Sequence, residues 1–174
     1  MKKRLVIGIF TFLLFFSAAA WALPPSKCII NPRNQAVYVP YITGEADDTP
    51  SIKIYRANSS IDRFWDAPIA ATISLPAGTF CYGLAVWQGE SSGRLLVSVS
   101  SANPALQSLR YYQLDSRGLP VDVARFQNID VSPALSSPFG VAIASDGNTA
   151  FFVDAMTGTC SALNTMPHPT HGDK

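Results

Sequence analysis

Short apolar runs separated by polar turn residues dominate the chain from residue 28 to about residue 160. The runs are rich in Val, Ile, Phe and Tyr, and clusters of Gly, Pro, Asn, Asp and Ser interrupt them, which is typical of β-strands and turns. After residue 22, no stretch shows the 3.6-residue apolar period of an amphipathic helix. The pattern therefore predicts an all-β fold. Its ten expected strands are 28–30, 36–41, 51–57, 69–75, 82–87, 95–100, 108–114, 124–131, 139–144 and 150–155.

These strands recur in a unit of about 57 residues, a length at which repeats indicate stacked supersecondary units. Residues 52–86 align without a gap with residues 109–143, and seven of the 35 positions are identical, Gly83 and Gly140 among them. Residues 29–44 align with residues 143–158 at a shift of 114, which is twice the same period. We expect four antiparallel strands in each unit, with units at 28–80 and 81–137, a partial unit at 138–160, and a flexible C-terminal tail at 161–174.

The segment 1–22 has the features of an export signal. Three basic residues precede the apolar run 5–16, and Ala20 and Ala22 form a small-x-small cleavage site before Leu23. A membrane anchor is the alternative, because residues 5–23 are almost long enough to span a bilayer. The two prolines that follow Leu23 favour cleavage. We therefore expect a periplasmic or extracellular protein with no stable membrane span after cleavage.

Cleavage leaves 152 of the 174 residues, with ten basic side chains against 12 acidic ones. This balance argues against a nucleic-acid partner, which would favour a basic surface. Export would place the cysteines Cys28, Cys81 and Cys160 in an oxidising compartment, where a disulfide can form. The spacing does not identify the pair, and three small buried apolar residues are the alternative.

The segment from Pro138 to Asp154 resembles the blade motif of secreted bacterial YVTN/NHL-type and lactonase-like β-propellers. In those families a Pro-x-Gly-Val-Ala inner strand leads through an Asp-Gly turn into an apolar strand. Here Gly140 and Ala142 would allow the inner strand to approach the central axis, and Asp146-Gly147 would form the hairpin turn. The resemblance implies that the repeats are propeller blades.

Ten strands make about two and a half blades, whereas propellers close with at least four. Three explanations follow from this count. The chain is a truncated member of its family, or it assembles with other copies through exposed blade faces, or the strands form a sandwich or small barrel instead. The sequence favours the first of these, an incomplete β-propeller, because the repeats stop within a blade near Cys160.

Candidates for catalysis or metal binding are few, and the sequence predicts no catalytic, cofactor or metal site. The histidines His168 and His171 both lie in the Pro-rich tail, so none is available within the repeats to act as a general base. If the chain were a lactonase-like hydrolase, its candidate catalytic carboxylates would be Asp66, Asp130 and Asp154. Asp154 occupies a turn position, where its side chain would cap backbone amides.

Aromatic residues near strand ends support a binding function. Trp65, Trp87 and Tyr111 are the expected contacts, with Tyr41 and Tyr112 close to other strand ends. Packing between blades is the alternative role for each of them. The sequence thus predicts an exported propeller-like module that binds a protein or glycan. The alternative function is a lactonase-like hydrolase, or its inactive fragment.

Overall fold

A computed structural model describes residues 28–41, 49–56, 67–129 and 138–163 of the chain. These residues form an all-β structure of three antiparallel sheets, together with one short 3₁₀ helix, η2 (Pro104–Leu106). Sheet A contains β1 (Ile29–Ile30), β2 (Ala36–Tyr41), β3 (Ser51–Arg56) and β4 (Ile69–Ser74). Sheet B contains β5 (Thr79–Gln88), β6 (Gly93–Ser101), β7 (Ser108–Leu114) and β8 (Gln127–Asn128). Sheet C contains β9 (Pro138–Ile143), β10 (Ala150–Asp154) and β11 (Cys160–Leu163).

Each sheet is a simple meander in which consecutive strands are neighbours. The second strands β2, β6 and β10 begin at residues 36, 93 and 150, so their spacing equals the period of the sequence repeat. The third strands β3 and β7 begin at residues 51 and 108, again one period apart. The sequence repeat therefore corresponds to a repeated structural unit.

The turn between β9 and β10 has the predicted form. Gly147 adopts φ +72° and its amide donates to the Ala144 carbonyl at 2.9 Å. The Asp146 carboxylate accepts from the amides of Asn148 and Thr149, at 2.8 and 3.3 Å. A positive φ strongly favours glycine, and a short acidic side chain is suited to bonding the amides that follow it. These two residues explain why the chain reverses here.

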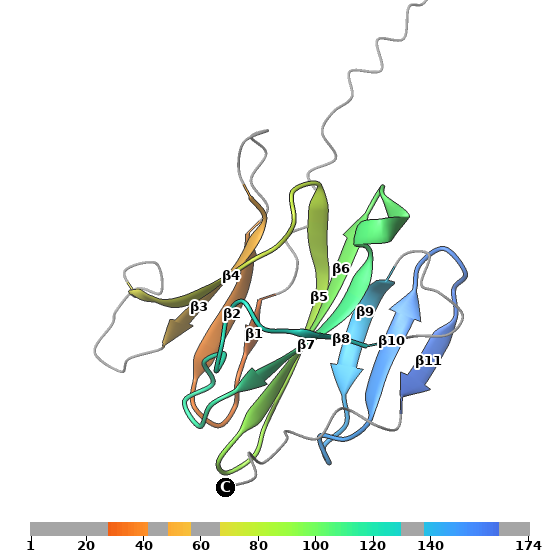
Figure 1. The fold of residues 1–174 in the computed structure, drawn as a ribbon. Helices are drawn as coiled ribbons and strands as arrows, with labels where there is room; N and C mark the ends of the chain where they lie inside the picture. Colours follow the sequence, from red (N-terminus) through yellow and green to blue (C-terminus); the bar gives the residue numbers. More distant parts are fainter. Residues whose placement is uncertain (1–27, 42–48, 57–66, 130–137, 164–174) are drawn as a thin grey trace, which may run out of the picture.

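Sheet B lies between the other two sheets and is buried on both faces, as the order of the sheets in Figure 1 illustrates. All nine residues of β6 are buried. Alternate residues of β6 point to opposite faces, so Leu95 and Val97 pack toward sheet A while Leu96 packs toward sheet C. The core between A and B also includes Ala36, Tyr38, Ile52, Ile54, Ile73, Leu75, Cys81, Leu84, Val99, Tyr112 and Leu114. The core between B and C also includes Leu109, Tyr111, Ala150 and Phe152.

The sheets approach most closely at their first strands. β5 contacts both β1 and β9, and β9 also contacts β6. A Cβ atom on Gly83 of β5 would lie 2.5 Å from the Phe139 carbonyl oxygen and 2.9 Å from Ser98 Oγ. The Ser98 hydroxyl donates to that same carbonyl at 2.8 Å. Glycine at position 83 is therefore required for the backbones of β5 and β9 to pack at this distance.

Polar contacts at the strand ends fix neighbouring sheets relative to each other. Between sheets A and B, the Tyr38 hydroxyl donates to the Gly118 carbonyl at 2.6 Å, and burial raises the pKa of this tyrosine to about 12. Between B and C, the Trp87 indole donates to the Ser145 carbonyl at 2.9 Å. The Arg94 guanidinium donates to the Gly147 carbonyl and, at 3.2 Å, to Asn148 Oδ1.

The structure corrects several details of the sequence predictions. The third unit has three strands and not two, because β11 follows a short turn and begins at Cys160, so residues 161–163 belong to a strand and not to the tail. The expected strand at 124–131 is only Gln127–Asn128 within the described residues. Crowding was expected around Gly140, but its nearest neighbour is Val153, which would lie 4.0 Å from an added Cβ atom, and the tight approach occurs at Gly83.

The three sheets are separate, and none closes on itself. The described strands therefore form neither a two-sheet sandwich nor a single closed barrel. In the part of the chain covered by the structure, no helix has the length and apolarity needed to cross a membrane.

Replacing Gly83 with alanine should destabilise the protein by about 1–3 kcal/mol, because the added methyl group must displace the β9 backbone. Urea denaturation followed by tryptophan fluorescence, in dilute solution, measures this. Gly140→Ala is the matched control at the equivalent repeat position, where space is available, and should change the free energy of unfolding by less than about 0.5 kcal/mol. Equal losses in both variants would contradict the described contact between β5 and β9.

Candidate functional site

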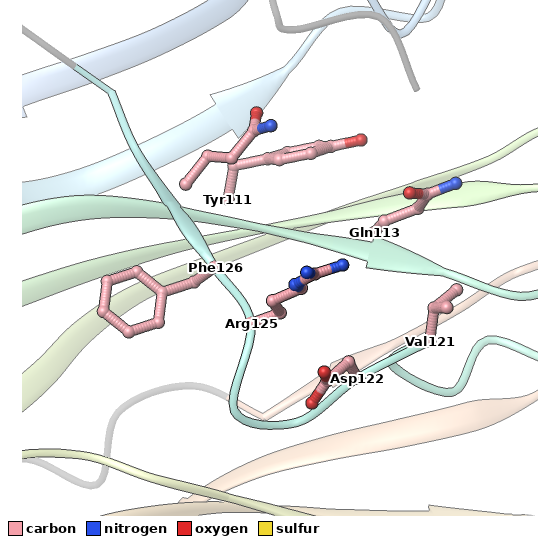
Figure 2. Close-up of a pocket in the computed structure, with 7 residues that line it drawn as sticks. Tyr111, Gln113, Val121, Asp122, Arg125 and Phe126 are labelled. Atoms are coloured by element: carbon pink, nitrogen blue, oxygen red, sulfur yellow. The ribbon is translucent and has the colours of Figure 1, made fainter. Parts of the chain in front are cut away.

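A pocket lies at the outer edge of sheet B, between β7 and the segment that returns along it. Its volume is about 160 Å³. We call it the Tyr111 pocket, and Figure 2 shows its lining side chains. They are Tyr111, Gln113, Val121, Asp122, Arg125, Phe126 and Gln127.

Two turns position the outer wall of the pocket. In the first, the Asp115 carboxylate accepts from the amides of Arg117 and Leu119, each at 2.9 Å, and Gly118 adopts φ +78°. In the second, Asp122 Oδ1 accepts from the Ala124 amide at 2.9 Å. Short acidic side chains stabilise such turns by bonding the amides that follow them. The chain between the turns is therefore held beside β7 without forming a regular strand.

Backbone hydrogen bonds join this returning segment to β7 on both sides of the pocket. The Val121 amide donates to the Gln113 carbonyl at 2.9 Å, and the Ile129 amide donates to the Leu109 carbonyl at 2.8 Å. Between these points β8 pairs with β7 only at Arg110 and Tyr111. The gap in pairing opens the pocket.

Tyr111 forms the buried side of the pocket. The residue is only 4% exposed, and its hydroxyl oxygen is buried without a hydrogen-bond partner among the described residues. Burial raises the pKa of Tyr111, and the nearby Arg94 offsets part of the rise. The Arg94 guanidinium nevertheless directs its hydrogen bonds to Gly147 and Asn148. Because this oxygen has essentially no accessible surface and lies near Arg94, other atoms of Tyr111 line the pocket.

Arg125 and Asp122 supply charged groups at the rim. Figure 2 shows the Arg125 guanidinium between Gln113 and Asp122, while the Phe126 ring points to the other side. Neither Arg125 nor Asp122 forms an ion pair within the parts of the chain that the structure describes. Both charges can therefore contribute to binding a ligand.

Phe126 is held by its contacts with β7. Its ring lies 5.8 Å from the Tyr112 ring, and the Arg110 guanidinium stacks over it at 4.2 Å. Phe126 is nevertheless 38% exposed, and Val121 is 63% exposed. The rim thus combines an anchored aromatic edge and an apolar side chain with the charged groups.

The pocket offers a ligand the cationic donor Arg125, the anionic acceptor Asp122, the side-chain amides of Gln113 and Gln127, and apolar surface. This combination can bind a neutral polar ligand that both donates and accepts hydrogen bonds. Its lining residues include no nucleophile adjacent to a general base, which covalent catalysis requires.

Comparison with known proteins does not assign the chain to a family, since no family model matches it and no curated protein has significant sequence similarity to it. The functional argument therefore depends on the site itself.

A second hollow is larger, with a volume of about 350 Å³. It lies where β5 begins and β6 ends, and the Tyr82 ring packs there against Phe139 with 5.2 Å between centroids. Its other lining residues are Phe80, Ser100, Ser101, Ala102 and Ala155. This lining includes no charged side chain, so it offers less for specific recognition than the Tyr111 pocket.

The predicted binding aromatics have different environments. Tyr111 lines the pocket, although its ring also packs in the core between B and C. Trp87 contacts sheet C, where a Cβ on Gly147 would lie 2.5 Å from the indole ring. Trp87 therefore joins sheets, as the packing alternative predicted. Trp65 lies outside the described residues.

The candidate carboxylates do not form a catalytic cluster within the described residues. Asp154 is buried, and its Oδ1 accepts from the amides of Met156 and Thr157 at 2.9 and 3.2 Å. This is the turn-capping role that the sequence suggested. Asp66, Asp130 and both histidines fall in parts of the chain that the structure leaves undescribed. Within the described ranges, no three His, Cys, Asp or Glu side chains are grouped to hold a metal ion.

All three cysteines are free thiols in the structure. Cys28 and Cys160 are exposed, whereas Cys81 is buried in the core between A and B. Burial raises the pKa of Cys81 to about 12, and its thiol donates to the Gly83 carbonyl at 3.7 Å. The structure therefore does not show the disulfide that export would permit. The cleavage-site residues Ala20, Ala22 and Leu23 precede the first described residue.

Sequence reasoning missed Gln113, Asp122, Arg125 and Phe126 as site residues. The sequence around residues 124–131 suggested a fourth strand, and in a regular strand these side chains would not surround a hollow. The sequence does contain one sign of this irregular segment. Pro120 and Asp122 both favour turns, which would interrupt regular pairing of this segment with β7.

Thiol titration checks the assignment of the cysteines. In dilute native protein, two thiols should react rapidly with Ellman's reagent, because Cys28 and Cys160 are exposed. The third should react only on unfolding, because Cys81 is buried and its thiolate is disfavoured at neutral pH. Fewer than three thiols in denaturant would instead reveal a disulfide, and three rapid thiols in native protein would contradict the burial of Cys81.

Proposed function

We propose that this chain is an exported binding module, built of consecutive blades of β-propeller type, that holds a glycan in the Tyr111 pocket. The observation that carries the proposal is a pocket of about 160 Å³ whose rim bears the opposite charges of Asp122 and Arg125 beside the exposed apolar Val121 and Phe126. The leader at residues 1–22 supports export, since its basic, apolar and small-residue segments have the order of a signal peptide.

The arrangement of the sheets supports the blade interpretation. Each sheet is an antiparallel meander, the second strands recur at the period of the sequence repeat, and neighbouring sheets pack closest at their first strands. Propeller blades are likewise four-stranded sheets arranged around a centre. The resemblance of residues 138–154 to the YVTN/NHL-type motif agrees with this interpretation.

The chemistry of the pocket favours a glycan over a peptide. Sugar hydroxyls both donate and accept hydrogen bonds, so they can use the Asp122 carboxylate and the Arg125 guanidinium at once. The exposed Val121 and Phe126 side chains provide an apolar surface for the C–H face of a sugar ring. The pocket volume of about 160 Å³ is close to that of a single sugar ring. A peptide would instead be expected to use the unpaired edge of a strand.

The lactonase-like alternative receives less support. Its best carboxylate candidate, Asp154, is bonded to the amides of a turn, and the groups that line the Tyr111 pocket contain no nucleophile with an adjacent base. Binding without catalysis therefore accounts better for the arrangement of these side chains.

Two variants test the proposal on an array of neutral, acidic and amino-sugar oligosaccharides, followed by calorimetry with the oligosaccharide that binds most tightly. Arg125→Gln and Asp122→Asn should each weaken binding by roughly 10- to 100-fold, because each removes a charged hydrogen-bond partner. Asparagine retains an oxygen that can accept from the Ala124 amide, so the turn should persist. Arg33→Ala is the control, since Arg33 lies in the turn between β1 and β2, its side chain is half exposed, and its one ion pair among the described residues is a 3.9 Å contact with Glu90.

Tyr111→Phe is a second control. The hydroxyl has essentially no accessible surface and no partner among the described residues of the free protein, so its removal should leave glycan binding within about twofold of the unaltered protein and the free energy of unfolding unchanged or slightly higher. Peptide binding lost in the Arg125→Gln and Asp122→Asn variants would overturn the choice of a glycan. Glycan binding that survives both of these changes would overturn the pocket.

A further inference from the structure

The second hollow is lined by three aromatic rings where the first strands of sheets B and C meet. The Tyr82 ring lies 6.2 Å from the Phe80 ring and 5.2 Å from the Phe139 ring, measured between centroids. The ring planes are tilted by 48° and 31°, so the rings do not stack flat on one another. Phe139 is 47% exposed, and the other two residues are partly exposed. We call this site, which leaves ring surface open to a ligand, the aromatic hollow.

A β-bulge in β5 directs Tyr82 into the aromatic hollow. Tyr82 lies between the paired residues Cys81 and Gly83 but has no partner in β6, so it is the extra residue of the bulge. Cys81 and Leu84 both pack toward sheet A, although strict alternation would place residues three apart on opposite faces. The bulge accounts for this and lets Tyr82 and Gly83, although adjacent, both face sheet C. Bulges often re-aim a side chain beside a functional site.

Backbone contacts hold Phe139 in place on the other side of the aromatic hollow. A Cβ atom on Gly83 would lie 2.5 Å from the Phe139 carbonyl oxygen, and the Ser98 hydroxyl donates to that oxygen at 2.8 Å. Tyr82 and Phe139 are one repeat period apart, so equivalent positions on neighbouring first strands supply two of the rings. Side chains on such strands are positioned more precisely than side chains on loops.

The aromatic hollow has no charged side chain and few free polar side-chain groups. The Ser101 hydroxyl donates to the Gly78 carbonyl at 2.8 Å and accepts from the Asn103 amide at 3.1 Å. Ser100 is only 5% exposed. The Tyr82 hydroxyl, in contrast, forms no hydrogen bond with the residues that the structure describes. This phenol can both donate and accept, and it is the polar side-chain group that the aromatic hollow offers to a ligand.

We propose that the aromatic hollow binds a small, neutral phenolic compound, with its flat ring against Tyr82 and Phe139 and its hydroxyl bonded to the Tyr82 hydroxyl. Aromatic rings attract one another in offset and edge-to-face arrangements, which the tilted rings allow. A charged ligand would lose hydration without gaining a partner of opposite charge. The volume of about 350 Å³ lies within the range of about 300–1,000 Å³ that is typical of small-molecule sites.

The same features argue against a glycan in the aromatic hollow. A sugar ring carries several hydroxyl groups, and each needs a hydrogen-bond partner once it is removed from water, whereas the lining side chains offer one free group. The aromatic hollow and the Tyr111 pocket share no lining residue. This inference therefore does not depend on the glycan proposed for the Tyr111 pocket, and either proposal can fail alone.

Fluorescence titration with 2-naphthol, a phenolic probe that is uncharged at neutral pH, tests the proposal. The probe should bind with a dissociation constant on the order of 0.1 mM, because a small ligand in an open hollow remains partly exposed. Phe139→Ser and Tyr82→Ser should each weaken binding about 10-fold, because each removes a ring that contacts the ligand. The Phe139 carbonyl that accepts from Ser98 is part of the backbone, so β9 should keep its place in the first variant.

Phe151→Ser is the matched control for Phe139→Ser. Phe151 is also an exposed phenylalanine of sheet C, at 40% against 47% for Phe139, but it does not line the aromatic hollow. This variant should bind 2-naphthol within about twofold of the unaltered protein. Equal weakening in both variants would overturn the proposal, because it would show adsorption of the probe to exposed rings in general. Absence of saturable binding in the unaltered protein would overturn it as well.

Tyr82→Phe tests the hydrogen bond separately from the ring contact. The variant keeps the ring, so it should bind 2-naphthol about 3- to 10-fold more weakly, yet bind 2-methylnaphthalene, which has no hydroxyl group, as tightly as the unaltered protein does. Equal losses for the two probes would overturn the hydroxyl contact. Competition of methyl glucoside with 2-naphthol would overturn the choice of a phenolic ligand in favour of a sugar.

Discussion

Burial of sheet B on both of its faces is the interaction on which the rest of the described structure depends. Each strand places alternate side chains on opposite faces, so a strand that is buried along its whole length must be covered on both faces. β6 is buried along its whole length, and sheets A and C provide the two covers. Removing either cover would expose a row of large apolar side chains, a loss that scales with the area returned to water. The stack is thus held mainly by the hydrophobic effect, and the polar contacts of Tyr38, Trp87 and Arg94 orient one sheet on the next.

The requirement for close packing is not uniform across a sheet. The first strands meet where Gly83 faces the β9 backbone, while the fourth strand of sheet B is reduced to two residues. Outer strands have less neighbouring surface to bury, so their backbone is free to depart from regular pairing. The Tyr111 pocket lies in this less constrained zone. A rigid inner strand, β7, supplies its buried tyrosine, and an irregular outer segment held by two aspartate turns supplies its charged rim. Binding groups on a loop beside a rigid scaffold are a common arrangement in proteins.

The two outer sheets differ from sheet B in how their faces are covered. Sheet B is covered on both faces by sheets A and C, whereas sheet C has one face that no described sheet covers. On that face Phe151 and Val153 are 40% and 37% exposed. Large exposed apolar patches are uncommon on soluble proteins. The Tyr111 pocket belongs to a different part of the molecule, because β7 and the segment after it line it.

Much of the fold could be predicted from the sequence because strands and turns are determined locally. Alternation of apolar residues, the sequence repeat and the Asp146-Gly147 turn depend on neighbours in the chain, and they predicted most of the strands to within a few residues. Whether a side chain packs between sheets or lines a pocket depends on contacts between distant segments of the chain. No local sequence pattern indicates these contacts. Gly83 and Gly140 look equivalent in sequence, yet only Gly83 has a neighbouring backbone against it among the described residues. Trp87 and Tyr111 were both candidate binding residues, but stacking directs Trp87 into a contact between sheets and brings Tyr111 to a pocket with side chains of the returning segment. The sequence by itself determined the strands, the turns and the repeat, because these follow from backbone preferences and side-chain alternation. Only the tertiary structure decided which faces are covered and which polar groups converge, because burial is a property of the packed sheets together.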